Sequence, residues 1–256
     1  MKYQLIFLIA ITTIHFKIYA TPAPGEEYIY VEPQSRYDNG YPEGRYHYII
    51  EKFKEIFNPI INEQGGTLIV FSDWTDGAVN MWAGRIENEY RLEIPGGFSR
   101  FYLINEDAFI LTICHELGHL LGGEPSSYDI SFEGQADYYS SFKCAERIFP
   151  RIEPYKPRQD NVEVDKACAN RKTPTDLDAC KRTLLGALSA TSYYAEIANV
   201  SFPQLSKRDT SRVDKTTEKH PQPQCRLDTM VAGFFKQPRP ACWYKGESYD
   251  LHDIIF

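Results

Sequence analysis

The residues with the clearest chemical potential in this chain of 256 residues lie in the stretch ICHELGHLLGG, residues 113–123. If the stretch is helical, His115 and His119 lie one turn apart on the same face, so both imidazoles can bind one metal ion. Glu116 lies beside them, where a carboxylate can accept a proton from a water molecule at that ion. Two histidines that only form hydrogen bonds within a core would show the same short pattern, so the metal site needs support from elsewhere in the chain.

The residues that follow determine which third ligand is available. A catalytic zinc site uses three protein ligands and keeps a fourth position for water. In the zinc-protease pattern HExxHxxGxxH the third histidine falls on position 125, which is Pro125 here, so that class is excluded. Glu133 and Asp137 lie one helical turn apart in the segment EGQAD. We predict that Glu133 is the third ligand and that Asp137 accepts the free ring N–H of a ligating histidine, the alternative being a solvated helix face.

These motifs resemble those of a known group of enzymes. HELGH followed by EGQAD is similar to the gluzincin metallopeptidases. Residues 220–227, HPQPQCRL, are similar to the HPxxxxR signature of the branch that contains the CAAX prenyl proteases and the HtpX-type membrane proteases. Within that branch the chain most resembles soluble, exported bacterial zinc proteases with CHELGH, EGQADY and HPxxQCRLDT blocks, over about residues 74–243. It departs from the membrane proteases because it has no apolar segment of spanning length after its first twenty residues.

The resemblance implies a zinc-dependent endopeptidase with one zinc ion per chain and a peptide or unfolded protein as substrate. Zinc would activate water and polarise the scissile carbonyl, with Glu116 as general base. His220 would stabilise the oxyanion or act as a fourth zinc ligand, and Arg226 would anchor Glu133 or Asp137. Two alternatives stay open: a non-catalytic zinc protein that binds peptides as a chaperone does, and another zinc hydrolase such as an amidase.

The N-terminus and the cysteines indicate where the protein works. Residues 1–20 contain Lys2, an apolar run and a small residue at Ala20, which is typical of a cleaved secretory signal, with an uncleaved anchor as the alternative. Six cysteines behind such a signal predict disulfides and a secreted or periplasmic protein. Of the many pairings that six cysteines allow, we favour only Cys168 with Cys180, because two helices joined by a short turn would bring them together. The net charge of −7 argues against nucleic acid as a partner.

The rest of the chain must position these residues, and we expect residues 21–256 to form one α+β domain of the zincin-like kind. The sequence pattern predicts an early strand at residues 26–31, a helix at 46–57 that stops before Pro59, and a β-meander at 67–71, 79–85 and 90–94. Asn105 is expected to cap the active-site helix, and Gly122 to end it. A helical C-terminal part follows, with a linker at 151–160, a long helix at 175–198 and an irregular polar segment at 201–219. By the resemblance, residues 90–94 or the neighbouring strand would hold an extended peptide at the edge of the sheet.

Overall fold

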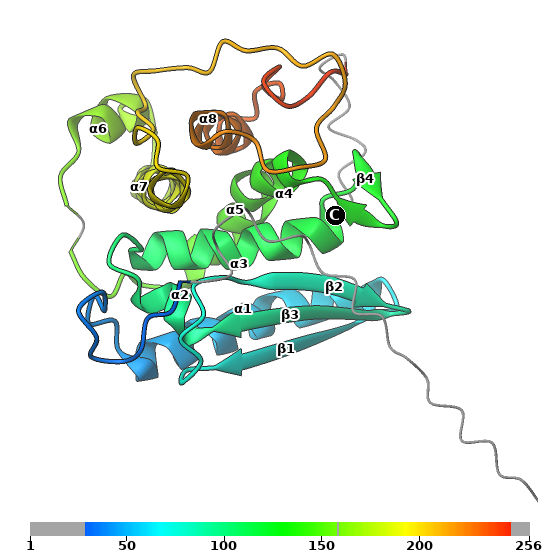
Figure 1. Ribbon diagram of the computed structural model, residues 1–256, viewed down its shortest axis with the longest axis vertical. Helices are drawn as coiled ribbons and strands as arrows, with labels where there is room; N and C mark the ends of the chain where they lie inside the picture. Colours follow the sequence, from blue (N-terminus) through cyan, green and yellow to red (C-terminus); the bar gives the residue numbers. More distant parts are fainter. Residues whose placement is uncertain (1–28, 158, 247–256) are drawn as a thin grey trace, which may run out of the picture.

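Layers of strands and helices surround the helix that carries the HELGH motif (Figure 1). The computed structural model describes residues 29–157 and 159–246, so the expected signal sequence at residues 1–20 lies outside the described residues. Helices and strands combine in this part of the chain, which confirms the prediction of an α+β fold.

The first helix, α1 (Glu43–Glu63), is longer than the sequence predicts. It continues through Pro59, so the predicted end before that proline was wrong. Buried Phe57 and Ile61 lie on either side of the proline and belong to the core, and this packing outweighs the hydrogen bond that proline cannot donate. The predicted early strand was also wrong within the described residues, because residue 30 forms only an isolated bridge.

The sheet has the strand order β1-β3-β2 and is not the predicted meander. β1 (Thr67–Asp73) pairs in parallel with β3 (Glu89–Pro95), which also pairs antiparallel with β2 (Trp82–Ile86). Because alternating apolar residues show which segments are strands but not which strands become neighbours, the sequence did not reveal this order. Residues 90–94 therefore lie in the central strand, and the neighbouring strand β2 is an edge of the sheet.

The active-site helix of the prediction, α3 (Glu106–Leu121), begins and ends as expected. The Asn105 side chain accepts a hydrogen bond of 2.8 Å from the backbone N–H of Ala108. Gly122 caps the C-terminus, and Gly123 follows with a φ of 71° in the left-handed region that glycine favours. Every residue of α3 after the first is buried, so the helix lies inside the protein rather than on its surface.

Short elements connect α3 to the strands before it and to the helix after it. A five-residue helix precedes it, and a small hairpin follows and leads into the helix that carries EGQAD. That helix continues through a π-helical turn into a further short helix and a 3-10 turn around Pro150, just before the predicted linker. In chain order these elements are α2 (Gly96–Arg100), β4 (Ser126–Ser127), β5 (Ile130–Ser131), α4 (Glu133–Tyr139), η2 (Ser140–Cys144), α5 (Ala145–Ile148) and η3 (Phe149–Arg151).

The C-terminal part is helical, as predicted. α6 (Val162–Cys168) precedes the long helix α7 (Pro174–Ile197), whose ends lie within one residue of the prediction. An irregular segment then leads to α8 (Pro223–Phe234). α7 packs against α3, and α8 packs against both α4 and α7, so residues late in the sequence lie over the motif helices (Figure 1).

Three disulfides join these elements. Cys168 pairs with Cys180, which confirms the one pairing that the sequence favoured. Cys114 pairs with Cys144 and links α3 to η2, and Cys225 pairs with Cys242 and links α8 to the segment after it. Within residues 29–157 and 159–246, no helix has the combined length and apolar character that crossing a membrane requires.

Candidate metal centre

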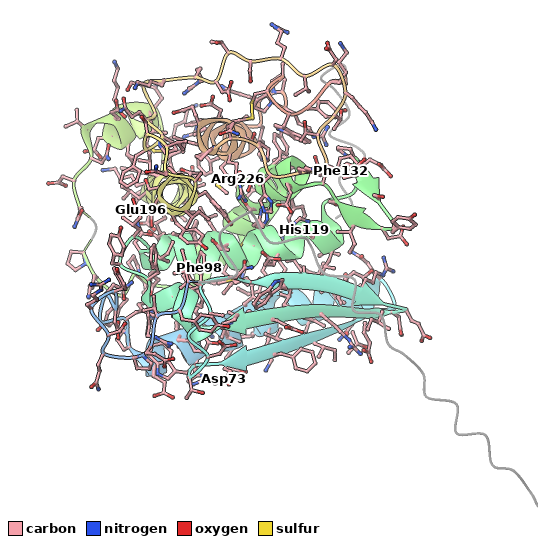
Figure 2. The ribbon with its side chains drawn as sticks, in the orientation of Figure 1. Asp73, Phe98, His119, Phe132, Glu196 and Arg226 are labelled. Atoms are coloured by element: carbon pink, nitrogen blue, oxygen red, sulfur yellow. A yellow bond between two sulfur atoms is a disulfide. The ribbon has the colours of Figure 1, made fainter. Side chains whose placement is uncertain are left out.

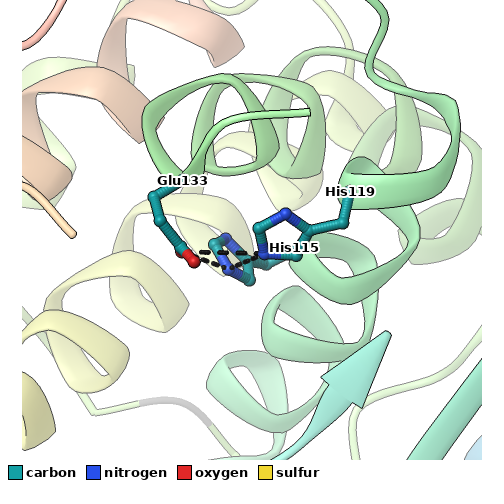
Figure 3. Close-up of side chains that lie close together, drawn as sticks. All are labelled: His115, His119 and Glu133. Atoms are coloured by element: carbon teal, nitrogen blue, oxygen red, sulfur yellow. Dashed lines mark hydrogen bonds and ion pairs between the residues drawn. The ribbon is translucent and has the colours of Figure 1, made fainter. Parts of the chain in front are cut away.

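His115, His119 and Glu133 converge between α3 and α4 (Figure 3). The two Nε2 atoms of the histidines lie 3.1 Å apart. Glu133 Oε2 lies 3.3 Å from the Nε2 of His115 and 3.6 Å from the Nε2 of His119. All three side chains are buried. The structure therefore brings together the three residues that were predicted from the sequence as metal ligands.

The other ring nitrogen of each histidine already has a partner. His119 Nδ1 lies 2.8 Å from the backbone carbonyl of Ser131, to which it can only donate. His115 Nδ1 lies 2.9 Å from Asp137 Oδ1. In neutral imidazoles with these partners, both Nε2 atoms carry lone pairs that face each other, and a cation between them converts that repulsion into attraction. This tautomer arrangement is the one that metal-binding histidines adopt.

The separations of the three ligand atoms fit a divalent transition-metal ion such as zinc. Zinc binds imidazole nitrogen and carboxylate oxygen at about 2.0–2.2 Å, and a tetrahedron of that size has edges of about 3.3 Å. The observed separations of 3.1, 3.3 and 3.6 Å lie around this value. Glu133 Oε2 is buried and has no hydrogen-bond partner within the described part of the chain, so a lone pair remains for an ion.

Close contact between α3 and α4 makes this convergence possible. Gly118 lies between the two histidines, and a Cβ at this position would be 2.8 Å from the backbone of Ala136. Real Cβ atoms do not approach a backbone so closely, so only glycine allows the two helices this separation. The glycine in HELGH thus has a packing role that brings Glu133 within reach of the histidines.

Asp137 is held from α8 by Arg226. The guanidinium donates from Nε to Oδ2 and from Nη2 to Oδ1, each at 2.8 Å, and both side chains are at most 1% exposed. The guanidinium also lies over the ring of Tyr194 on α7, with its central carbon 3.7 Å from the ring centroid. Figure 2 shows Arg226 between α8 and the helix that carries His119. The structure therefore places Arg226 behind the metal centre, on the carboxylate that orients His115.

The charges of these groups shift one another's pKa. Burial lowers the pKa of His115, but the carboxylates of Asp137 and Glu133 outweigh burial and raise it to about 10. Burial raises the pKa of Asp137, but Arg226 and His115 outweigh it, and the pKa falls below its usual range. The pKa of Glu133 is also lowered, because nearby histidines outweigh its burial. Without an ion the centre thus keeps a proton on His115, which a metal must displace.

His220 reaches the centre from the irregular segment before α8. Its Nε2 lies 3.1 Å from Glu133 Oε2, and its side chain, 23% exposed, is more open to solvent than those of the three candidate ligands. Burial lowers its pKa to about 4, so the imidazole is neutral at physiological pH. The ligand atoms of His115, His119 and Glu133 all lie within 4.8 Å of one another, and this group does not include His220.

Glu116 is buried on α3, directly after His115. Its spacing of three residues from His119 places it on the same side of the helix as that ligand. Two further contacts at the centre involve residues that sequence analysis did not single out, namely the Ser131 carbonyl and the Tyr194 ring. A backbone carbonyl leaves no signal in the sequence, and Tyr194 has no fixed spacing from the motif that it contacts.

Comparisons with protein-family models, with curated proteins and with solved structures give no match for this chain. The chemistry of the centre and the resemblance of its motifs therefore indicate what the protein does.

Proposed function

We propose that the protein is a secreted or periplasmic zinc-dependent endopeptidase of the gluzincin kind, with a zincin-like fold. The observation that carries this proposal is the buried cluster of His115, His119 and Glu133, whose facing Nε2 atoms suit a cation. Glu116 on the same helix adds a carboxylate that a purely structural ion does not need. Zinc bound at the cluster would supply Lewis acidity and lower the pKa of water there.

Each residue around the cluster has a role in the proposed hydrolysis. Glu116 accepts the proton of the attacking water and passes it to the leaving amine. His220 is neutral and can donate an N–H to the carbonyl oxygen as negative charge develops on it. Asp137 keeps the Nδ1 proton on His115, and Arg226 keeps Asp137 charged and oriented.

The sheet offers a place for an extended substrate. β2 pairs with β3 along one side, and no other strand of the described residues pairs with it. It is also the strand most closely packed against α3. A peptide segment that adds to β2 as a further strand would therefore lie beside the motif helix, with main-chain hydrogen bonds that do not depend on sequence. Peptides and unfolded proteins are the substrates that can adopt this extended form.

The proposed location agrees with two features of the structure. Three disulfides suit an oxidising compartment. The described helices also include none that could span a membrane. Both features are compatible with a secreted or periplasmic protein.

A non-catalytic metal protein that binds peptides is the second candidate. The observation in its favour is the burial of the cluster, because all three ligand side chains are at most 8% exposed. A structural ion is normally closed off by protein, whereas a catalytic ion keeps a position open. The two candidates differ in what they require of Glu116, since only hydrolysis needs a general base.

The test is proteolysis of an unfolded protein by the purified protein at one zinc per chain, compared with Glu116→Gln at the same zinc content. A general base typically contributes about 100- to 10,000-fold, so Glu116→Gln should lose at least about 100-fold in kcat. Glu63→Gln, at an exposed position on α1, serves as the matched control and should keep full activity. Equal activity in wild type and Glu116→Gln contradicts the mechanism, and no cleavage by the zinc-loaded wild type favours the non-catalytic candidate.

A further inference from the structure

The ligand helix α4 has two neighbouring faces, and only one of them meets the metal centre. Glu133 and Asp137 are one turn apart and face α3. Gly134 and Tyr138 form the next such pair around the helix. This second face packs against residues 237–245, which we name the C-terminal clasp. The clasp therefore contacts the residues adjacent to both Glu133 and Asp137 without contributing an atom to the cluster.

The contacts between the clasp and α4 are close. The Trp243 indole is fully buried, and a Cβ on Gly134 would lie 2.2 Å from it. Tyr138 donates from its hydroxyl to the backbone carbonyl of Gln237 at 2.8 Å. Arg239 Nε donates to Gln135 Oε1 at 2.6 Å. These contacts hold the helix at Gly134, Gln135 and Tyr138.

The clasp also holds the segment that brings His220 to the centre. The backbone N–H of Val213 donates to the Ala241 carbonyl at 3.0 Å, and that of Thr217 donates to the Trp243 carbonyl at 2.8 Å. The disulfide of Cys225 with Cys242 then ties the clasp to α8. One short segment is thus attached to the ligand helix, to the approach of His220 and to the helix that carries Arg226.

Glu133 depends on this support more than the histidines do. His119 is oriented by the Ser131 carbonyl and His115 by Asp137, each through its Nδ1 atom. Glu133 Oε2 lies near the imidazoles of the cluster and of His220 but accepts no hydrogen bond within the described part of the chain, so the position of the α4 backbone decides how well it meets them. A small shift or rotation of α4 moves the carboxylate out of range of the histidines, because metal ligation tolerates little displacement.

We propose that the C-terminal clasp is the positioning element for Glu133, and that the Cys225–Cys242 disulfide keeps the clasp closed and so sets the affinity of the centre for its metal. Trp243 is the main positioning residue, because its indole occupies the space above Gly134. The inference rests on the metal centre of the proposed function, but it does not depend on peptidase activity.

The test compares two disulfide deletions by their zinc dissociation constants, measured by competition with a chromophoric chelator. Cys225→Ser/Cys242→Ser opens the clasp, whereas Cys168→Ser/Cys180→Ser removes a disulfide between α6 and α7. The two disulfides span 17 and 12 residues, so both deletions release similar chain entropy and serve as matched variants. Opening the clasp should weaken zinc binding about 10- to 100-fold, as loss of support around a ligand does, and the control should stay within about threefold of wild type.

A second pair of variants tests the packing of Trp243 and applies even if a disulfide deletion does not fold. Gly134→Ala places a methyl group against the indole, whereas Gly44→Ala on α1 places one in open space. Gly134→Ala should weaken zinc binding about 10-fold or more, and Gly44→Ala should not change it. In a Trp243→Ala background, Gly134→Ala should cause little further loss, because the space above the glycine is then free.

Two results would overturn the proposal. One is equal zinc affinity in both disulfide deletions, and the other is a folded Gly134→Ala protein that binds zinc as wild type does. Circular dichroism establishes folding in each case. If the wild-type protein is inactive but the variants show the expected zinc affinities, the proposal for the clasp stands and only the proposed peptidase activity is contradicted. Failure of one proposal is therefore distinguishable from failure of the other.

Discussion

The ion pair of Arg226 with Asp137 gives the sharpest test of the structure. Replacing Arg226 with methionine keeps much of the side-chain volume but removes the guanidinium from the buried carboxylate of Asp137, which then keeps its contact with His115 Nδ1. Both side chains are at most 1% exposed, so water cannot replace the lost partner. Removing one member of such a pair typically costs about 3–5 kcal/mol of unfolding free energy. We expect the loss of unfolding free energy in metal-free Arg226→Met protein to fall in this range.

A second substitution separates the buried charge from the lost packing. Asp137→Asn removes the charge and leaves an amide oxygen that can still accept from His115 Nδ1. The double variant, Asp137→Asn with Arg226→Met, therefore removes both charges of the buried ion pair. Its unfolding free energy should exceed the value expected from adding the two single losses by about 1–3 kcal/mol, the usual coupling of contacting residues.

Chemical denaturation of the four metal-free proteins, followed by circular dichroism, measures these free energies. Arg208→Met is the control, because its side chain is 57% exposed and its contact with Asp228 is 3.5 Å long. An ion pair that is so exposed to solvent contributes about 1 kcal/mol or less to the free energy of unfolding. If Arg226→Met loses no more unfolding free energy than this control, the buried pair does not stabilise the fold as described. Losses of the two single variants that simply add would contradict it as well.

Three further predictions concern the centre and its surroundings. The metal-free protein should be most stable near pH 6.5. The pKa of His220 is lowered from 6.5 to about 4 in the folded protein, so as the pH falls His220 is protonated first in the unfolded chain. The free energy of unfolding therefore decreases between pH 6.5 and 4. The pKa of His115 is raised from 6.5 to about 10, so the stability it contributes is lost as the pH rises from 6.5 to 10. Denaturation at graded pH measures both effects, and a free energy of unfolding that does not change with pH would contradict both shifts. His220→Ala should keep its zinc, because His220 lies outside the convergent set, yet lose about 100-fold in peptidase kcat as an oxyanion donor; loss of zinc in this variant would instead make His220 a ligand. Gly118→Ala should lower the free energy of unfolding by about 1–3 kcal/mol and weaken zinc binding, because its Cβ would clash with the backbone of Ala136. Wild-type values in thermal unfolding and zinc titration would show that α3 and α4 can accommodate the methyl group.

Local patterns in the sequence predicted the centre better than they predicted the sheet. The three candidate ligands lie on two helices whose turns set the spacing of their side chains, so the residues that meet could be chosen before the fold was known. The Asn105 cap and the Cys168–Cys180 disulfide were predictable for the same reason, because each joins residues close in sequence. His220 and Arg226 came only from the resemblance, since nothing in their spacing points to a centre about a hundred residues earlier.

The features that could not be predicted depend on contacts between distant segments. The alternation of apolar residues identified three strands, but the parallel pairing of β1 with β3 depends on how the chain crosses between them. The continuation of α1 past Pro59 depends on packing of Ile61 in the core, which the local pattern does not record. Tyr194 reaches Arg226 only because α7 and α8 lie side by side. The catalytic roles of the residues at the centre stay predictions.

The distribution of these contacts along the chain also bears on the order in which the centre is built. His119 reaches the Ser131 carbonyl across 12 positions, whereas Arg226 reaches Asp137 across 89. Closing the longer loop costs about 2 kcal/mol more chain entropy, and long-range contacts of this kind form late in folding. During synthesis, which proceeds from the N-terminus, all three ligands emerge well before α8. An ion captured by the growing chain would therefore be held first by candidate ligands that Arg226 does not yet support. The oriented centre would be complete only when the segment around Arg226 has been made and has docked.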